Sequence, residues 1–287
     1  MNDLVISTVR NAFNFSVVKS PLTGPNGATT PYYGLFRSDT NEAVGRAVSQ
    51  RYVPHSTDDV LALAESASAA FGEGCEAKCS FMGRHYVAIQ PSVEQRVAIF
   101  GTSDNVFPRI IINAGYDGRA FRASIGYFRD ACKNMHIMRM VSGTSVSIHH
   151  TGNLRLEMDD LLQTFSVLRE SWGTLTAVIH RMQEARINLA SFLEQVYGEP
   201  NESQTAVTRH KKRTEAIVNR LLRERHITGR VAEDSMAVSV WEAFNAVQGH
   251  AQHNSTRRGN PDEMARVIMA GRDGAVRRAE QVAMLAI

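Results

Sequence analysis

The chain has 287 residues, a hydrophobic fraction of 43% and a formal net charge of +3, so it can bury a sizeable core in one or two domains. A charge this small does not by itself indicate a nucleic-acid partner. An odd count of three cysteines argues against a disulfide scaffold. We expect neither a secreted form nor a membrane span, because the sequence shows no signal-type leader and no apolar run of membrane length. We expect a soluble cytoplasmic protein with no membrane contact.

The first third of the chain predicts a loop, a hairpin and a helix. Residues 20–31 are rich in Pro, Gly and Thr and predict a loop. Apolar and polar residues alternate over 32–39 and 43–54, and this pattern predicts a first β-hairpin. The segment STDDVLALAESASAAF places a cap residue and two aspartates before apolar residues at helical spacing, which predicts a helix.

From about residue 75 to residue 126 the apolar pattern has a period of two and predicts four strands. The turn AGYDG carries the Asp-Gly pair that is typical of hairpins. The next segment, IGYFRDACKNMHIM, predicts a helix that places Arg129, Lys133 and His136 on one face.

After residue 150 the apolar residues follow a heptad pattern. The positions are Leu154, Met158, Leu161, Phe165, Leu168, Trp172, Leu175, Ile179 and Met182. This heptad seam predicts a long helix, packed either in a bundle within the chain or against another copy in a coiled coil. Further helices are predicted over 205–226, 235–253, 260–269 and 275–286. The fold class is therefore α+β: a domain over 1–150 with a largely antiparallel sheet and a basic hairpin and helix, then a helical domain over 151–287.

Catalytic and metal-binding motifs are weak. The sequence has no Walker loop, Rossmann glycine fingerprint or nucleophile elbow, so we expect neither an enzyme nor a cofactor. Cys75 and Cys79, with His85 nearby, have zinc-like spacing without a second ligand pair, and buried thiols are the alternative. His250 and His253 can share one helix face, either as metal ligands or as structural polar groups, and we favour the structural role.

Two clusters of basic residues suggest a nucleic-acid partner. Aromatic residues, including Tyr127, are interleaved with the first cluster, as a single-strand groove requires. We expect nucleic-acid contacts from Arg109, Arg119, Arg122, Tyr127, Arg129, Lys133 and Arg139. The second cluster lies on the helix over 205–226 and adds Lys212 and Arg213, with a solvated helix face as the alternative.

Several separated motifs carry a family resemblance from about residue 32 to the end. They are YYGLFRSDTNEAVGRAVSQRYVPHSTDDVLALAE, YDGRAFRASIGYFRDACKNM, IHHTGNLRLEMDDLL, WEAFNAVQGHAQHNSTRR and GRDGAVRRAEQVAMLA. The chain resembles the phage- and plasmid-borne family called domain of unknown function 932. It departs from the family pattern as we know it at Gln248, Gly249 and Ala251.

The resemblance implies a mobile-element protein in a bacterial cytoplasm. The predicted order of helix, β-meander and basic helix is also similar to that of phage single-strand annealing proteins of the RecT/Red-beta group, although fold does not fix function. We expect a single-stranded DNA-binding protein that promotes annealing or recombination as a homo-oligomer. The alternative is a non-enzymatic module that binds a host defence or replication protein.

Overall fold

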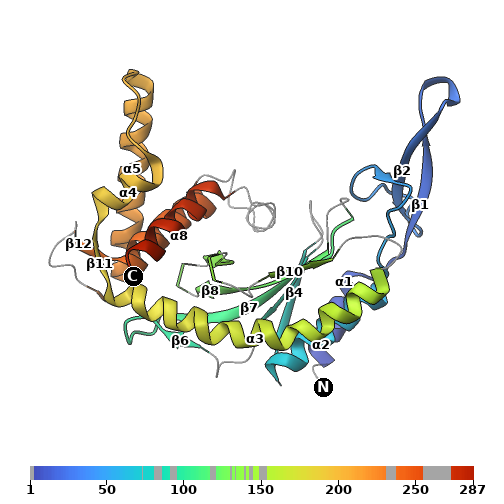
Figure 1. Ribbon diagram of the computed structural model, residues 1–287, viewed down its shortest axis with the longest axis horizontal. Helices are drawn as coiled ribbons and strands as arrows, with labels where there is room; N and C mark the ends of the chain where they lie inside the picture. The colour runs from blue at the N-terminus through green and yellow to red at the C-terminus, as the bar shows by residue number, and fades with distance from the viewer. Residues whose placement is uncertain are drawn as a thin grey trace. The chain divides into compact units, whose positions relative to one another are not determined.

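The computed structural model describes residues 3–72, 74–80, 86–90, 96–116, 121–129, 131–132, 134–138, 140–141, 145–148, 154–230, 237–254 and 273–287. They form a mixed α+β structure with antiparallel sheets (Figure 1). The chain divides into two compact units. Unit 1 comprises residues 1–95, 108–126 and 143–171, and unit 2 comprises residues 96–107, 127–142 and 172–287.

Two helices of unit 1 pack against its larger sheet. Helices α1 (Asp3–Ala12) and α2 (Thr57–Phe71) contact each other, and they contact β4 (Glu76–Ser80) and β5 (Tyr86–Gln90) respectively. Ser56 is the cap residue of α2 and forms a capping box with Asp59, so the predicted helix is confirmed. The strand order is β10-β8-β7-β5-β4, where β7 is Asn105–Asn113, β8 is Phe121–Arg129 and β10 is Ser145–Ile148.

A second sheet of unit 1 is a long hairpin with a short third strand. Strand β1 (Val17–Thr23) pairs antiparallel with β2 (Thr29–Arg37), and β2 pairs with β3 (Val48–Ser49). A single 3-10 turn, η1 (Pro25–Gly27), joins the two long strands. The predicted loop over 20–31 is therefore wrong for most of its length, because β1 and β2 extend through it. The antiparallel pairing of β2 with β3 confirms the predicted hairpin of 32–39 with 43–54, and β1 is an additional partner of β2.

Unit 2 is built around one fully buried helix. Every residue of α6 (Val240–Gly249) is buried, and α6 contacts both α5 (Gln204–Ile227) and α8 (Gly274–Leu285). Helix α4 (Leu189–Tyr197) packs on α8, and a five-residue π-helix, η3 (His250–Asn254), continues α6. The short strands β6 (Val97–Ala98) and β9 (Met135–His136) pair with the unit 2 ends of β7 and β8.

The long helix α3 (Leu154–Glu184) confirms the helix that the heptad seam predicts. The seam residues Phe165, Leu168, Leu175, Ile179 and Met182 are buried within the single chain, and Trp172 is half-buried. The structure does not describe the side chains of Leu154, Met158 and Leu161. The described part of the seam is therefore buried within the chain.

Other sequence predictions need correction. The helix predicted over 125–138 is wrong: β8 continues to Arg129, and β9 follows at Met135. The second half also contains a small sheet of β11 (Arg186–Asn188) and β12 (Ala237–Ser239), so it is not purely helical. The predicted division into domains at residue 150 stays a prediction, while limits of the two compact units fall inside β7, β8 and α3. The helix predicted over 260–269 lies outside the described residues.

Candidate functional site

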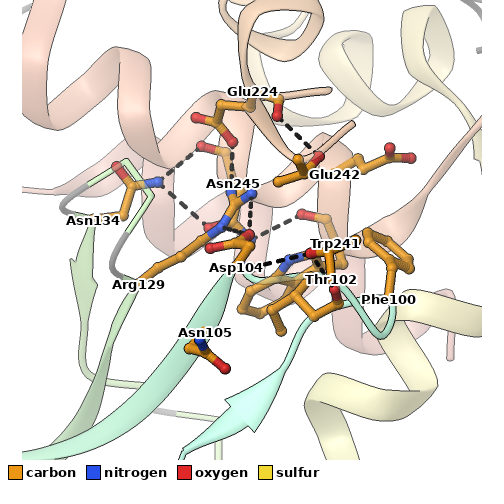
Figure 2. Close-up of polar contacts among 12 residues, drawn as sticks. Phe100, Thr102, Asp104, Asn105, Arg129, Asn134, Glu224, Trp241, Glu242 and Asn245 are labelled. Atoms are coloured by element: carbon orange, nitrogen blue, oxygen red, sulfur yellow. Dashed lines mark hydrogen bonds and ion pairs between the residues drawn. The ribbon is translucent and has the colours of Figure 1, made fainter. Parts of the chain in front are cut away.

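Arg129 lies at the centre of a buried ionic network in unit 2 (Figure 2). Its side chain is placed by the end of β8 and is only 4% exposed. The guanidinium donates from Nε to Oδ2 of Asp104 over 2.7 Å and from Nη1 to Oε2 of Glu224 over 2.5 Å. Burial lowers the pKa of Arg129, but Cys132, Glu224 and Asp104 outweigh burial and raise this pKa overall, so the group stays charged.

Asn134 connects this network to α5, α6 and η3. Its Nδ2 donates to the backbone oxygen of Asn245 over 3.3 Å, and its Oδ1 accepts from Nη2 of Arg220 over 3.4 Å. Nε2 of His253 lies 3.1 Å from the same Oδ1, so that nitrogen carries a proton in this arrangement. His253 therefore makes a structural contact, and burial followed by the charge of Arg220 lowers its pKa.

Glu242 holds the start of α6 to the end of α5. Its carboxylate accepts two bonds from Arg225, of 2.8 and 3.0 Å, and lies 3.6 Å from Arg230. Ser239 and Glu242 form a capping box, with Glu242 Oε2 accepting from the Ser239 backbone amide. Burial raises the pKa of Glu242, but the bonds from Arg225 and Ser239 lower it overall.

Two further contacts fix β8 and β9 against α6 and α8. The fully buried hydroxyl of Tyr127 donates to Oε1 of Gln248 over 2.8 Å, and the Tyr127 ring lies 5.4 Å from that of Trp241. His136 contacts Oε2 of Glu280 over 3.0 Å. Nε2 of Gln248 and Nδ1 of His136 have no hydrogen-bond partner in the described part of the chain, so these contacts satisfy only part of the buried polar groups.

The predicted DNA contacts divide into three sets. Tyr127, Arg129 and Arg109 are buried, and Arg109 donates to Oε1 of Gln90 over 2.6 Å, so none of the three presents a free surface in this structure. Arg122 and Lys212 are exposed, and Arg213 is half-buried. Arg119, Lys133 and Arg139 lie outside the described residues.

The N-terminal half of α5 in unit 2 is exposed and carries more basic than acidic residues. No residue from 204 to 216 is buried, and in Figure 1 this part of α5 extends away from α8. At helical spacing, Arg209, Lys212 and Arg223 share one face, which we call the α5 stripe. All three are exposed and have no ion pair among the residues that the structure describes.

The cysteines and histidines do not assemble a metal site in the described part of the chain, where no three His, Cys, Asp or Glu side chains are grouped to hold an ion. Burial raises the pKa of Cys79 and of Cys132 to about 11, and these thiols therefore stay protonated at neutral pH. No described helix combines the length and apolar character that a membrane span requires.

The model of one protein family, described as a domain of unknown function (DUF932), matches residues 46–282. The chain belongs to this family. No curated protein and no solved structure gives a significant match. The buried network lies within the matched span, as do α5 and α6.

Sequence reasoning missed most of the buried network. Asp104 and Glu224 lie 25 and 95 residues from Arg129, and a local pattern cannot reveal pairing over such distances. Glu242 was detectable, because Ser239-x-x-Glu242 is a capping-box signature before an apolar run.

Proposed function

We propose that the protein binds single-stranded DNA through the α5 stripe and serves strand annealing or recombination. The observation that carries the proposal is the exposed basic face of Arg209, Lys212 and Arg223, which form no ion pair with a described residue. Arg209 and Lys212 lie in the half of α5 that has no buried residue. Over fourteen residues the stripe is roughly 20 Å long, enough for about three phosphates of an extended strand.

The charge pattern of α5 supports an anionic partner over a merely solvated face. The exposed part of the helix carries Arg209, Lys211, Lys212 and Arg223, with Glu215 as the exposed acidic residue. Glu215 lies four residues after Lys211 and three after Lys212, spacings at which opposite charges can form salt bridges on a solvated helix, but it forms no ion pair with a described residue. Phosphate contacts by such a face release counterions, so binding must weaken steeply as salt is added.

We predict that the double variant Arg209→Gln/Lys212→Gln binds a labelled single-stranded oligonucleotide more weakly than wild type. Because each lost phosphate contact removes about 0.7 from the slope of log K against log salt, the slope should fall by about 1.4 in magnitude. Fluorescence anisotropy across a salt series measures both quantities. The control is Lys78→Gln/Lys211→Gln, which removes the same charge from exposed positions outside the stripe and should leave the slope near that of wild type.

Two comparisons complete this experiment. A duplex of the same length tests strand preference, and complementary strands test annealing. Equal slopes for the two double variants, or no salt-dependent affinity in wild type, would exclude the α5 stripe as the DNA contact. Light scattering with and without DNA tests the accompanying proposal of a homo-oligomer.

A second candidate function, an interaction module for a host protein, is favoured by the β1–β2 hairpin of unit 1. The sequence carries no charge from Ser20 to Phe36. One hairpin face presents Val18, 47% exposed, and Tyr32, 56% exposed, next to half-buried Leu22 and Phe36. Exposed apolar side chains gathered on one face are typical of protein contacts.

For this candidate, we predict that Val18→Thr/Tyr32→Thr abolishes co-purification of a specific host protein while the circular dichroism spectrum stays unchanged. The two side chains are exposed, so their truncation should cost little stability. Mass spectrometry of proteins that co-purify with wild type and variant from the host provides the measurement. Identical sets of co-purified proteins would count against the hairpin as a docking surface.

A further inference from the structure

Three arginines of unit 2, two from α5 and one from α8, lie against α4 and the end of α6. We call this group, Arg213, Arg220 and Arg278 with His250, the junction cluster. The Arg213 guanidinium stacks on the Tyr197 ring, 3.8 Å from its centroid, and Arg278 donates from Nε to the backbone oxygen of Val196 over 2.6 Å.

Contacts with α4 and α6 place the members of the cluster close together. Arg213 lies on the Tyr197 ring and Arg278 on the carbonyl of the preceding Val196, and the charges of both oppose the rise in the pKa of Tyr197 that burial causes. Arg220 packs against Gly249 so closely that a Cβ at that glycine would collide with its guanidinium, which places Arg220 directly beside His250.

The junction cluster has too few carboxylates for its arginines. Arg220 pairs with Glu224 over 3.1 Å, but Glu224 also serves Arg129. Arg213 and Arg278 have no carboxylate partner among the residues that the structure describes. Nε of half-buried Arg213 and Nδ1 of half-buried His250 also have no hydrogen-bond partner in the described part of the chain.

A half-buried cation without a counter-ion is costly, and folded proteins usually pair such groups. Guanidinium groups match the oxygen spacing of phosphate and bind it through paired hydrogen bonds. The stacking of Arg213 on Tyr197 and its bond from Nη2 to Nδ1 of His210, 3.2 Å, hold the side chain in place before any ligand arrives. Such preorganisation reduces the entropy that binding must overcome.

We infer that the junction cluster binds one phosphate group, with Arg213 as the main ligand and Arg220, Arg278 and His250 around it. The source of that phosphate rests on the proposed function: it is the backbone or an end of the DNA strand that the α5 stripe binds. Arg213 lies one residue after Lys212, so the cluster borders the stripe on the same helix.

The charges around His250 give the site a pH dependence. Burial lowers the pKa of His250, and Arg213 and Arg220 of α5 lower it further. From α6, the nearby Asn245 and Gln248 carry no charge, and His253 of η3 is the neighbouring titratable group. A bound phosphate offsets the arginine charges and favours the protonated imidazole, so phosphate binding should raise the pKa of His250.

The test is a titration of the full-length protein with inorganic phosphate at constant ionic strength, followed by nuclear magnetic resonance of the histidine rings. His250→Gln assigns the His250 signal. We expect phosphate to raise the pKa of His250 in wild type and in Lys211→Gln, an exposed charge-matched control, but not in Arg213→Gln. At pH 7.5 the affinity for phosphate should fall about tenfold in Arg213→Gln, the loss expected for a charge-assisted hydrogen bond.

A second arm uses a single-stranded oligonucleotide in the same three proteins. If phosphate leaves the His250 titration unchanged in wild type, the phosphate site is wrong, whatever the oligonucleotide does. If inorganic phosphate binds through Arg213 but the oligonucleotide does not bind, the site stands and the proposed DNA function fails. Equal phosphate affinity in Arg213→Gln and Lys211→Gln would overturn the assignment to Arg213.

Discussion

Placing aspartate at both Phe165 and Leu168 of α3 should unfold the protein at neutral pH. Both side chains are at most 1% exposed, so each substitution loses apolar packing and buries a charge without a partner. Each substitution should lower the free energy of unfolding by at least about 3 kcal/mol. The two losses together exceed about 5 kcal/mol, the lower end of the free energies of unfolding of natural domains. Circular dichroism and thermal unfolding should show loss of the cooperative transition.

The matched control is Val167→Asp/Thr174→Asp, which places the same charges on exposed positions of the same helix. The free energy of unfolding of this variant should lie within about 1 kcal/mol of that of wild type. A folded Phe165→Asp/Leu168→Asp protein that is smaller than wild type by light scattering would contradict packing of the seam within the chain. It would favour the coiled-coil alternative.

The elements that sequence predicted well are those whose signals are local. The capping box at Ser56 and the Ser203 cap before α5 each lie within four residues of the helix that they begin. The heptad seam of α3 is similarly a short-range repeat, and it marks the buried face correctly at Leu175 and Ile179.

The segment after the second hairpin was mispredicted because burial there depends on distant partners. The period-two pattern predicts the strand only as far as residue 126, and beyond Ala123 the buried run of Ser124, Ile125, Gly126 and Tyr127 shows no alternation that would continue it to Arg129. A charged residue such as Arg129 normally indicates a surface, and the helical spacing of Arg129 and Lys133 then suggested a shared basic face.

The same reasoning explains why the polar residues of α6 give no sequence signal of burial. Glu242, Asn245 and Gln248 recur every three residues, a spacing that usually marks a solvated helix face. All three are buried, because Arg225, Trp241 and Tyr127 supply their hydrogen-bond partners. The sequence could predict the helix but not the partners that allow its polar residues inside.

Replacing Arg129 with methionine should lower the free energy of unfolding by about 3–5 kcal/mol, because Asp104 would remain buried without its cation and Glu224 would keep only Arg220. Methionine keeps much of the side-chain volume, so the loss reports on charge and not on a cavity. The double variant Arg129→Met/Asp104→Asn should recover much of that loss, since Glu224 and Arg220 then remain paired with each other. Urea unfolding at pH 7 measures all three proteins.

The pH dependence of the single variant provides a further check. Burial already raises the pKa of Asp104, and removing Arg129 removes the group that opposes this rise. A carboxyl group with a raised pKa in the folded state destabilises the protein above its unfolded pKa, and this penalty disappears as the group is protonated. The stability gap between Arg129→Met and wild type should therefore narrow from pH 7 to pH 5, and a constant gap would contradict buried, uncompensated carboxylates.

This variant also separates the two roles that Arg129 has been given. If the ionic network is its role, the folded fraction of Arg129→Met should bind single-stranded DNA with the affinity and salt slope of wild type. A slope reduced by about 0.7 with unchanged stability would instead indicate a phosphate contact. Because Arg129 is 4% exposed and donates to two carboxylates, we expect the loss in stability and no change in slope.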